Sequence, residues 1–131
     1  MIVKVFVIVA ALATLGLNSL NAASALGIDT KEWTNPSKEM VAQVEALEAA
    51  TVAMAKGEKP QVALQATIDK IRELAEKGND KDALFSMGIL MQQSNQQNAL
   101  AEATAYYLKA AELGQLQAMN NYGSILAGSG Q

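Results

Sequence analysis

The sequence predicts an all-α fold, arranged as a short solenoid of antiparallel helical hairpins, and three observations lead to this prediction. The residues Ala83 to Gly88 return as Ala118 to Gly123, at an offset of 35. The residues Leu74 to Gly78 return as Ala110 to Gly114, at an offset of 36. Five amphipathic segments follow one another with short connections and without the alternation that marks strands. Self-similarity at this period is typical of arrays in which each helical unit packs on the next.

Residues 1–22 are predicted to be a secretory signal peptide. Lys4 supplies the positive charge, residues 5–17 form an apolar run of 13, and small residues follow a short polar stretch. The run is shorter than the roughly 20 apolar residues of a membrane-spanning helix. Cleavage is expected after Ala22, with Ala25 as the alternative site. An uncleaved N-terminal anchor is the other arrangement left open.

Composition excludes several classes of function. Without Lys4, the chain has 10 − 1 = 9 basic against 13 acidic residues, a net charge of −4. This balance, without a cluster of Lys or Arg, argues against binding to nucleic acid or, after cleavage of the leader, to membranes. There is no His and no Cys, so the commonest general base, the thiol nucleophile and the usual zinc ligands are missing. We therefore expect neither an enzyme nor a metal or cofactor.

The first part of the mature chain is predicted to be an extended lead-in over residues 23–35, followed by a helix. Asn35 and Pro36 suit the N-cap and the first helical position. Gly57 suits the left-handed position after the helix. The expected buried stripe is Met40, Val41, Val44, Leu47, Thr51 and Met54.

A second helix is expected from Pro60 to the break at Gly78, and a third begins after Asn79 or Asp80, which act as caps. Asp82 falls in the first turn, where a carboxylate interacts favourably with the helix dipole. The predicted buried faces are Leu64, Ile68, Ile71 and Leu74 or Ala75 in the second helix, and Ala83, Leu84, Met87, Leu90 and Met91 in the third.

After a polar loop at residues 92–98, the last two helices are expected at about residues 99–113 and 116–127. Ala103, Tyr107, Ala110 and Ala111 share one face of the fourth helix. Gly88 and Gly123 occupy matching positions inside helices, where each costs about 1 kcal/mol relative to Ala. Their presence predicts close approach between helices at both positions.

Residues 83–123 resemble the Sel1-like repeat, a relative of the tetratricopeptide repeat. The segment Ala83–Gly88 is similar to the Ala-x-x-x-Leu-Gly opening of helix A in that family, and Ala118–Gly123 restarts it. Residues 101–114 are similar to the helix B signature, in which an Ala precedes aromatic-Tyr-x-Lys-Ala-Ala-Glu-x-Gly. The loop at 92–98 departs from the glycine-rich loop of the family. The matched structural positions are Ala83, Gly88, Tyr107, Ala110, Ala111, Gly114, Ala118 and Gly123.

This resemblance implies an α-solenoid of about two and a half repeats, with residues 36–131 as the repeat domain. It also implies a protein–protein interaction module, an adaptor or scaffold, exported to the periplasm or secreted, with a protein or peptide partner. A membrane-tethered or self-assembling structural module is an alternative, with self-association through the open C-terminal helix. A cell-wall hydrolase is a third, less favoured by the missing His and Cys.

Four residues are candidates for partner binding. Tyr106 points about 100° away from Tyr107 on the same helix, so it is expected at the surface when Tyr107 is in the core. The resemblance places Asn120 and Asn121 on the concave surface of the repeat. Trp33 stands alone before the first helix, either as a lid over that helix or as an exposed anchor for a partner.

Overall fold

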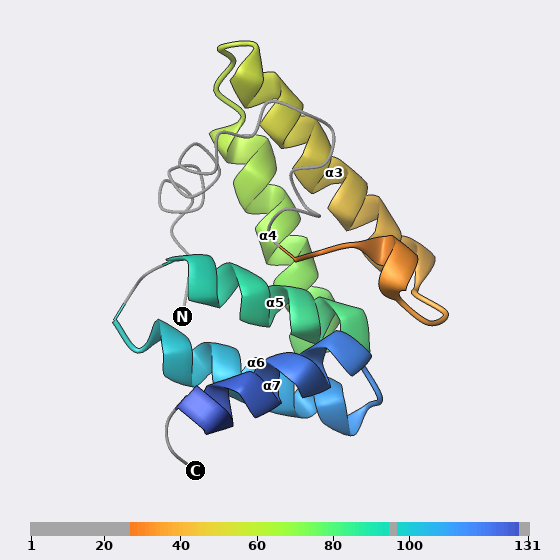
Figure 1. Ribbon diagram of the computed structural model, residues 1–131. Coiled ribbons are helices and arrows are strands. Elements are labelled where there is room, and N and C mark those ends of the chain that lie inside the picture. The colour runs from red at the N-terminus through yellow and green to blue at the C-terminus, as the bar shows by residue number, and fades with distance from the viewer. Residues whose placement is uncertain (1–26, 95–96, 129–131) are drawn as a thin grey trace.

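The structure of the protein is a computed structural model in which residues 27–94 and 97–128 are described. Over these residues the chain is all-helical, which confirms the predicted class (Figure 1). The predicted signal peptide and both cleavage sites lie outside the described residues. The elements are a 3-10 turn, η1 (Thr30–Glu32), and the helices α3 (Lys38–Ala55), α4 (Gln61–Glu76), α5 (Lys81–Ser94), α6 (Ala99–Glu112) and α7 (Leu116–Gly128).

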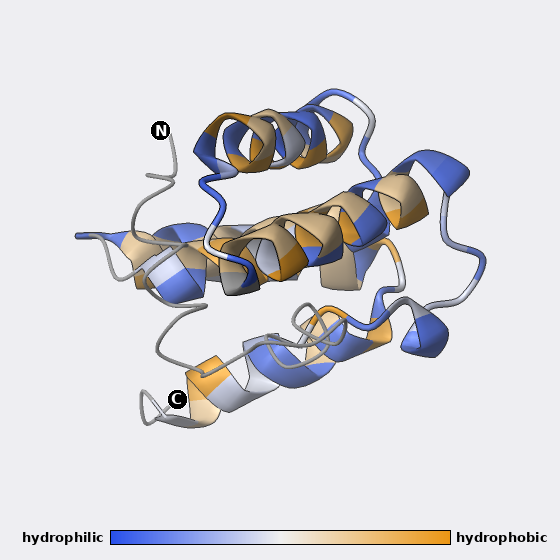
Figure 2. Ribbon diagram, turned by 90° about the horizontal axis from the view of Figure 1, so that it is seen from above, coloured by the Kyte–Doolittle hydropathy of each residue, from blue (hydrophilic) through white to orange (hydrophobic). Residues whose placement is uncertain are grey.

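The main helix–helix contacts join sequence neighbours, α3 with α4, α4 with α5, α5 with α6 and α6 with α7, and the contact of α5 with α6 is the most extensive. In Figure 1, α3 and α4 run side by side in opposite directions, and α5, α6 and α7 then reverse direction in turn. Apolar and polar residues alternate around the helices, as expected when each buries part of its surface (Figure 2). No described helix is both long and apolar enough to cross a membrane.

The helix ends follow local chemistry, with one correction to the sequence-based prediction. Ser37, rather than Asn35, caps α3, because its Oγ accepts the Met40 N–H at 3.1 Å. Asn35 instead adopts a left-handed backbone with φ 49°. At the other ends of α3 and α6, Gly57 and Gly114 adopt positive φ and allow the chain to leave the helix, which was predicted for Gly57.

Helix α5 lies at the centre of the fold, because every residue from Asp82 to Met91 is buried. The sequence predicted a single buried face, but Phe85, Ser86 and Ile89 on the remaining sides are buried as well. A helix that is buried on all sides must be covered by several neighbours. Here α4 and α6 both pack against it.

The two matching glycines differ in their surroundings. A Cβ atom on Gly88 would lie 2.4 Å from Tyr107 Cε1, so the ring of α6 packs directly on the backbone of α5. A Cβ atom on Gly123 would meet no described atom outside its own helix backbone within 4 Å. The predicted close approach is therefore confirmed at Gly88 and wrong at Gly123, because no following helix covers α7 within the described chain.

The N-terminal lead-in belongs to the core, and the prediction of an extended segment is wrong over residues 30–32. Ile28 is fully buried and Trp33 is 8% exposed, on either side of η1. Gln117 Nε2 on α7 donates to the Glu32 carbonyl at 3.1 Å, which joins the lead-in to the last helix. With the turn η1 between them, the side chains of Ile28 and Trp33 both lie in the core.

Candidate functional site

An inter-helix groove lies between α4 and α6, and residues of α5 form part of its base. Its volume is about 350 Å³. The base consists of three apolar residues, Ala75, Leu84 and Met91, each of which is 1% exposed. The remaining lining residues, all polar except Ala105, come from α4, the following turn and α6: Glu76, Asn79, Glu102, Ala105, Tyr106 and Lys109.

Tyr106 is one of the residues that line this groove. It is half-buried, and its Oη donates a hydrogen bond to Glu76 Oε1 at 2.8 Å. Burial raises the pKa of the Tyr106 hydroxyl, and the hydrogen bond and negative charge of Glu76 raise it further. The phenol therefore stays neutral and holds α6 to the end of α4, which keeps the two walls of the groove in place.

The walls carry charges of both signs around an apolar base. Glu102 and Lys109 lie four residues before and three residues after Tyr106, so the three side chains share one face of α6. Glu76 adds a carboxylate from α4. An apolar base with charged walls suits an apolar side chain whose flanking backbone or polar groups meet the rim.

The groove is small, with an apolar base and charged groups in its walls. Its volume is at the lower end of the roughly 300–1,000 Å³ of small-molecule pockets, enough for one or two side chains of a partner. No group of three acidic, His or Cys side chains in the described part of the chain could hold a metal ion. The groove offers packing and charge to a ligand.

The structure does not bring the four predicted binding residues together. Tyr106 lines the groove, whereas Trp33 is buried among the lead-in and core residues and is no exposed anchor. Asn120 is exposed on α7. Asn121 lines a separate shallow pocket of about 310 Å³ with Gln92, Ser124 and Ile125.

Asn121 has a structural contact that the sequence did not indicate. Tyr107 is fully buried, and its Oη donates a hydrogen bond to Gln92 Oε1. Burial raises the pKa of Tyr107 to about 12, and the hydrogen bond with Asn121 works in the opposite direction. Asn121 thus contacts the tyrosine that packs on Gly88, and connects α7 to the core.

Asp80 and Asp82 have different roles, although both were predicted at the start of a helix. Asp80 is the cap, because its Oδ1 accepts the N–H groups of Asp82 at 2.9 Å and Ala83 at 3.0 Å. Asp82 is fully buried, and its carboxylate lies 3.0 Å from Lys81 Nζ. It also accepts a 3.1 Å hydrogen bond from Gln115 Nε2, immediately before α7.

Part of the groove could have been found from the sequence. Glu102 and Lys109 share the face of Tyr106 by helical spacing alone. Glu76 and Asn79 come from a different hairpin, and no local pattern indicates that they meet Tyr106. Asp82 carries no sequence signal that distinguishes a buried carboxylate from a second cap.

No protein-family model, curated protein or solved structure matches this chain. The likeness to the Sel1-like repeat therefore rests on the motifs within residues 83–123.

Proposed function

We propose that this chain is a Sel1-like α-solenoid of about two and a half repeats that acts as an adaptor by binding a segment of another protein. The repeated motifs at 83–88 and 118–123 and the helix-by-helix packing support the repeat type. The leader-like pattern of residues 1–22 supports export, to the periplasm or outside the cell. The inter-helix groove is the proposed binding site.

The apolar base of the groove, open between two helices, carries this proposal. Leu84 and Met91 belong to the fully buried core, yet they also line a groove of about 350 Å³. An inserted side chain would thus contact the core itself. Aromatic residues such as Tyr106 at the wall of a groove are frequent contributors to binding energy. A partner segment with one large apolar side chain next to polar or charged residues fits these features.

A matched pair of substitutions tests the groove. Ala105 and Ala49 are both exposed helical alanines, but only Ala105 lines the groove. Ala105→Trp fills the groove, whereas Ala49→Trp adds the same side chain to α3. Proteins crosslinked to each tagged variant in its native cell are quantified by mass spectrometry, with helical content compared by circular dichroism.

We expect Ala105→Trp to reduce the captured partner by at least about tenfold, the equivalent of about 1.4 kcal/mol. Ala49→Trp should capture as much partner as the wild type. Equal capture by the two variants, or no specific partner of the wild type, would contradict the proposal.

A further inference from the structure

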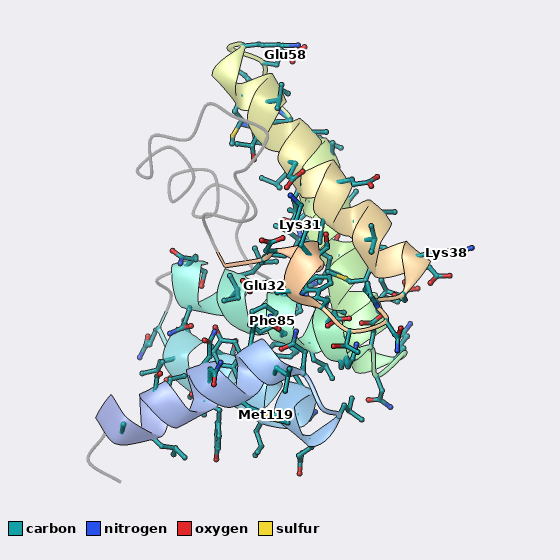
Figure 3. All side chains as sticks on the ribbon, turned by 45° about the vertical axis from the view of Figure 1, so that its right-hand side comes forward. Lys31, Glu32, Lys38, Glu58, Phe85 and Met119 are labelled. Atoms are coloured by element: carbon teal, nitrogen blue, oxygen red, sulfur yellow. The ribbon has the colours of Figure 1, made fainter. Side chains whose placement is uncertain are left out.

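The outer face of α7 is exposed along its whole length. Counted from Leu116, its residues follow the spacing 0, 3, 4, 7, 8 and 11, which defines a single stripe on a helix. We call it the α7 stripe: Leu116, Met119, Asn120, Gly123, Ser124 and Ala127. Two large apolar side chains stand out, with Leu116 59% and Met119 44% exposed. In Figure 3, Met119 lies on the outer side of α7, and Phe85 of α5 lies on its other side.

Helix α5, which matches α7 in the repeat, shows what packs on such a face. Gly88 of α5 corresponds to Gly123 of α7 at the offset of 35, and Tyr107 of α6 packs on Gly88. The surface around Gly123 is open. Successive helices from α3 to α7 pack on one another. The α7 stripe is the face on which a further helix would pack, and no helix of the described chain covers it.

Charge and shape single out one occupant. Residues 116–128 contain no acidic or basic side chain, so two copies of α7 would face each other without charge repulsion, although the chain as a whole is acidic. In an antiparallel pair centred between Asn121 and Tyr122, residues whose numbers add to 243 lie opposite each other. Leu116 then faces Ala127, Met119 faces Ser124, and Asn120 faces Gly123 of the second copy.

We propose that the α7 stripe is a self-association surface on which two copies of this chain pair with their α7 helices antiparallel. A larger side chain meets a smaller one in each of the three pairs, which allows the helix axes to approach closely. Antiparallel helix dipoles also attract at both ends. The groove between α4 and α6 is lined by no residue of α7, so its partner and the second copy bind at different places.

The pair is weak because the contact is short. From Leu116 to Ala127 the stripe is about 16 Å long, at 1.5 Å per residue. It buries less than the about 800 Å² per partner of a standard stable interface. We expect a dissociation constant on the order of 10–100 µM.

The first test measures the molar mass of the full chain against concentration by sedimentation equilibrium. Gly123→Glu places a charged side chain inside the stripe, and Gly128→Glu places the same charge on α7 outside it. Both glycines are open, with no described atom outside their own helix backbone within 4 Å of an added Cβ, so the fold should tolerate both changes. Circular dichroism verifies that both variants keep their helical content.

We expect the wild type and Gly128→Glu to form dimers with similar constants, and Gly123→Glu to associate at least about tenfold more weakly. Because all variants carry the same N-terminal residues, any association through those residues cancels in the comparison. A wild type that remains monomeric through the millimolar range, or equal effects of the two variants, overturns the proposal. If the wild type remains monomeric, the α7 stripe binds a different partner or none.

The second test determines the direction of the helices, in a chain that has no native cysteine. Leu116→Cys and Ala127→Cys copies are oxidised separately and as a mixture. In the antiparallel pair, residues 116 and 127 of different copies are opposite, whereas two copies of residue 116 are about 16 Å apart along the axis. A disulfide requires Cα atoms closer than about 7 Å. Crosslinking only in the mixture is expected, and crosslinking of either variant alone overturns the antiparallel arrangement.

Discussion

Tyr107 packs on the backbone of α5 at Gly88, where an added Cβ would lie 2.4 Å from its ring. The same residue type at Gly123 meets open space. Glycine therefore has different surroundings at these two matching repeat positions. At Gly88 the steric requirement is visible in the structure, whereas at Gly123 no residue of the described chain packs on the helix backbone.

Alanine at each of the two glycines should have opposite effects on the free energy of unfolding. Gly88→Ala should lower it by about 1–3 kcal/mol, because the ring of Tyr107 and the backbone of α5 have to separate. Gly123→Ala should raise it by about 1 kcal/mol, since Ala is the better helix former and its methyl group has room. Urea unfolding of dilute protein measures both, and similar effects of the two substitutions would argue against this packing.

Tyr107 also makes the stability of the protein sensitive to alkaline pH. The pKa of its hydroxyl is about 12 in the folded chain and about 10 when unfolded. Its contribution is complete below pH 10 and is lost as the pH rises towards 12, because the unfolded state releases the proton first. The wild type should lose about 2 kcal/mol more than Tyr107→Phe over this range. Urea midpoints measured at several pH values check the difference, and parallel curves would contradict it.

At the scale of elements, α7 is positioned by polar contacts at its start. Gln115, immediately before α7, joins that helix to α5. Its Oε1 accepts the Ala118 N–H at 2.8 Å, and its Nε2 donates to the buried Asp82. Gln117 donates to the Glu32 carbonyl in the lead-in. These contacts tie the last helix to the centre and to the beginning of the fold.

Removal of the Asp82 carboxylate should loosen α7 selectively. Asp82→Ala removes one acceptor from Lys81, which keeps the Thr34 carbonyl, and one from the buried Gln115 amide, which keeps Gln117 Oε1. The loss of these two contacts should cost about 1–3 kcal/mol of unfolding free energy. Glu73→Ala removes an exposed carboxylate that pairs with the exposed Lys70 at 3.3 Å, and should cost less than about 1 kcal/mol. Hydrogen exchange should accelerate in α7 of the Asp82 variant before it does so in α3 and α4. Uniform acceleration across all helices would contradict this role.

At the scale of the whole molecule, the lead-in completes the core. Ile28 and Trp33 are buried, and both remain in the chain after cleavage at either predicted site. Trp33 is the single tryptophan of the chain. Its Nε1 is buried without a hydrogen-bond partner among the described residues, so apolar packing is what this side chain contributes.

Trp33→Ala should reduce the unfolding free energy by about 3–5 kcal/mol. Trp33→Phe should retain most of the stability, because the indole N–H makes no hydrogen bond to a described residue. In the wild type, the fluorescence of Trp33 should be protected from an aqueous quencher until the chain unfolds. Ready quenching in the folded protein would show that the lead-in is detached from the core.

The sequence by itself determined the helical class and the approximate place of each helix. Apolar periodicity, capping residues and helix-ending glycines act within a few residues, so Gly57 and Gly114 could be recognised without knowledge of the rest. The repeat added the expectation that Gly88 is a point of close contact. Half of the groove, the face of Tyr106 with Glu102 and Lys109, also follows from spacing on one helix.

Only the tertiary structure decided which of these surfaces meet. It brought Glu76 to Tyr106 from 30 positions away, buried Asp82 against Gln115, and drew Trp33 into the core. It also surrounded α5 on all sides and left the outer face of α7 open. The physical reason is that these contacts join residues far apart in sequence, where burial and hydrogen bonding depend on the packing of whole helices and leave no local pattern to read.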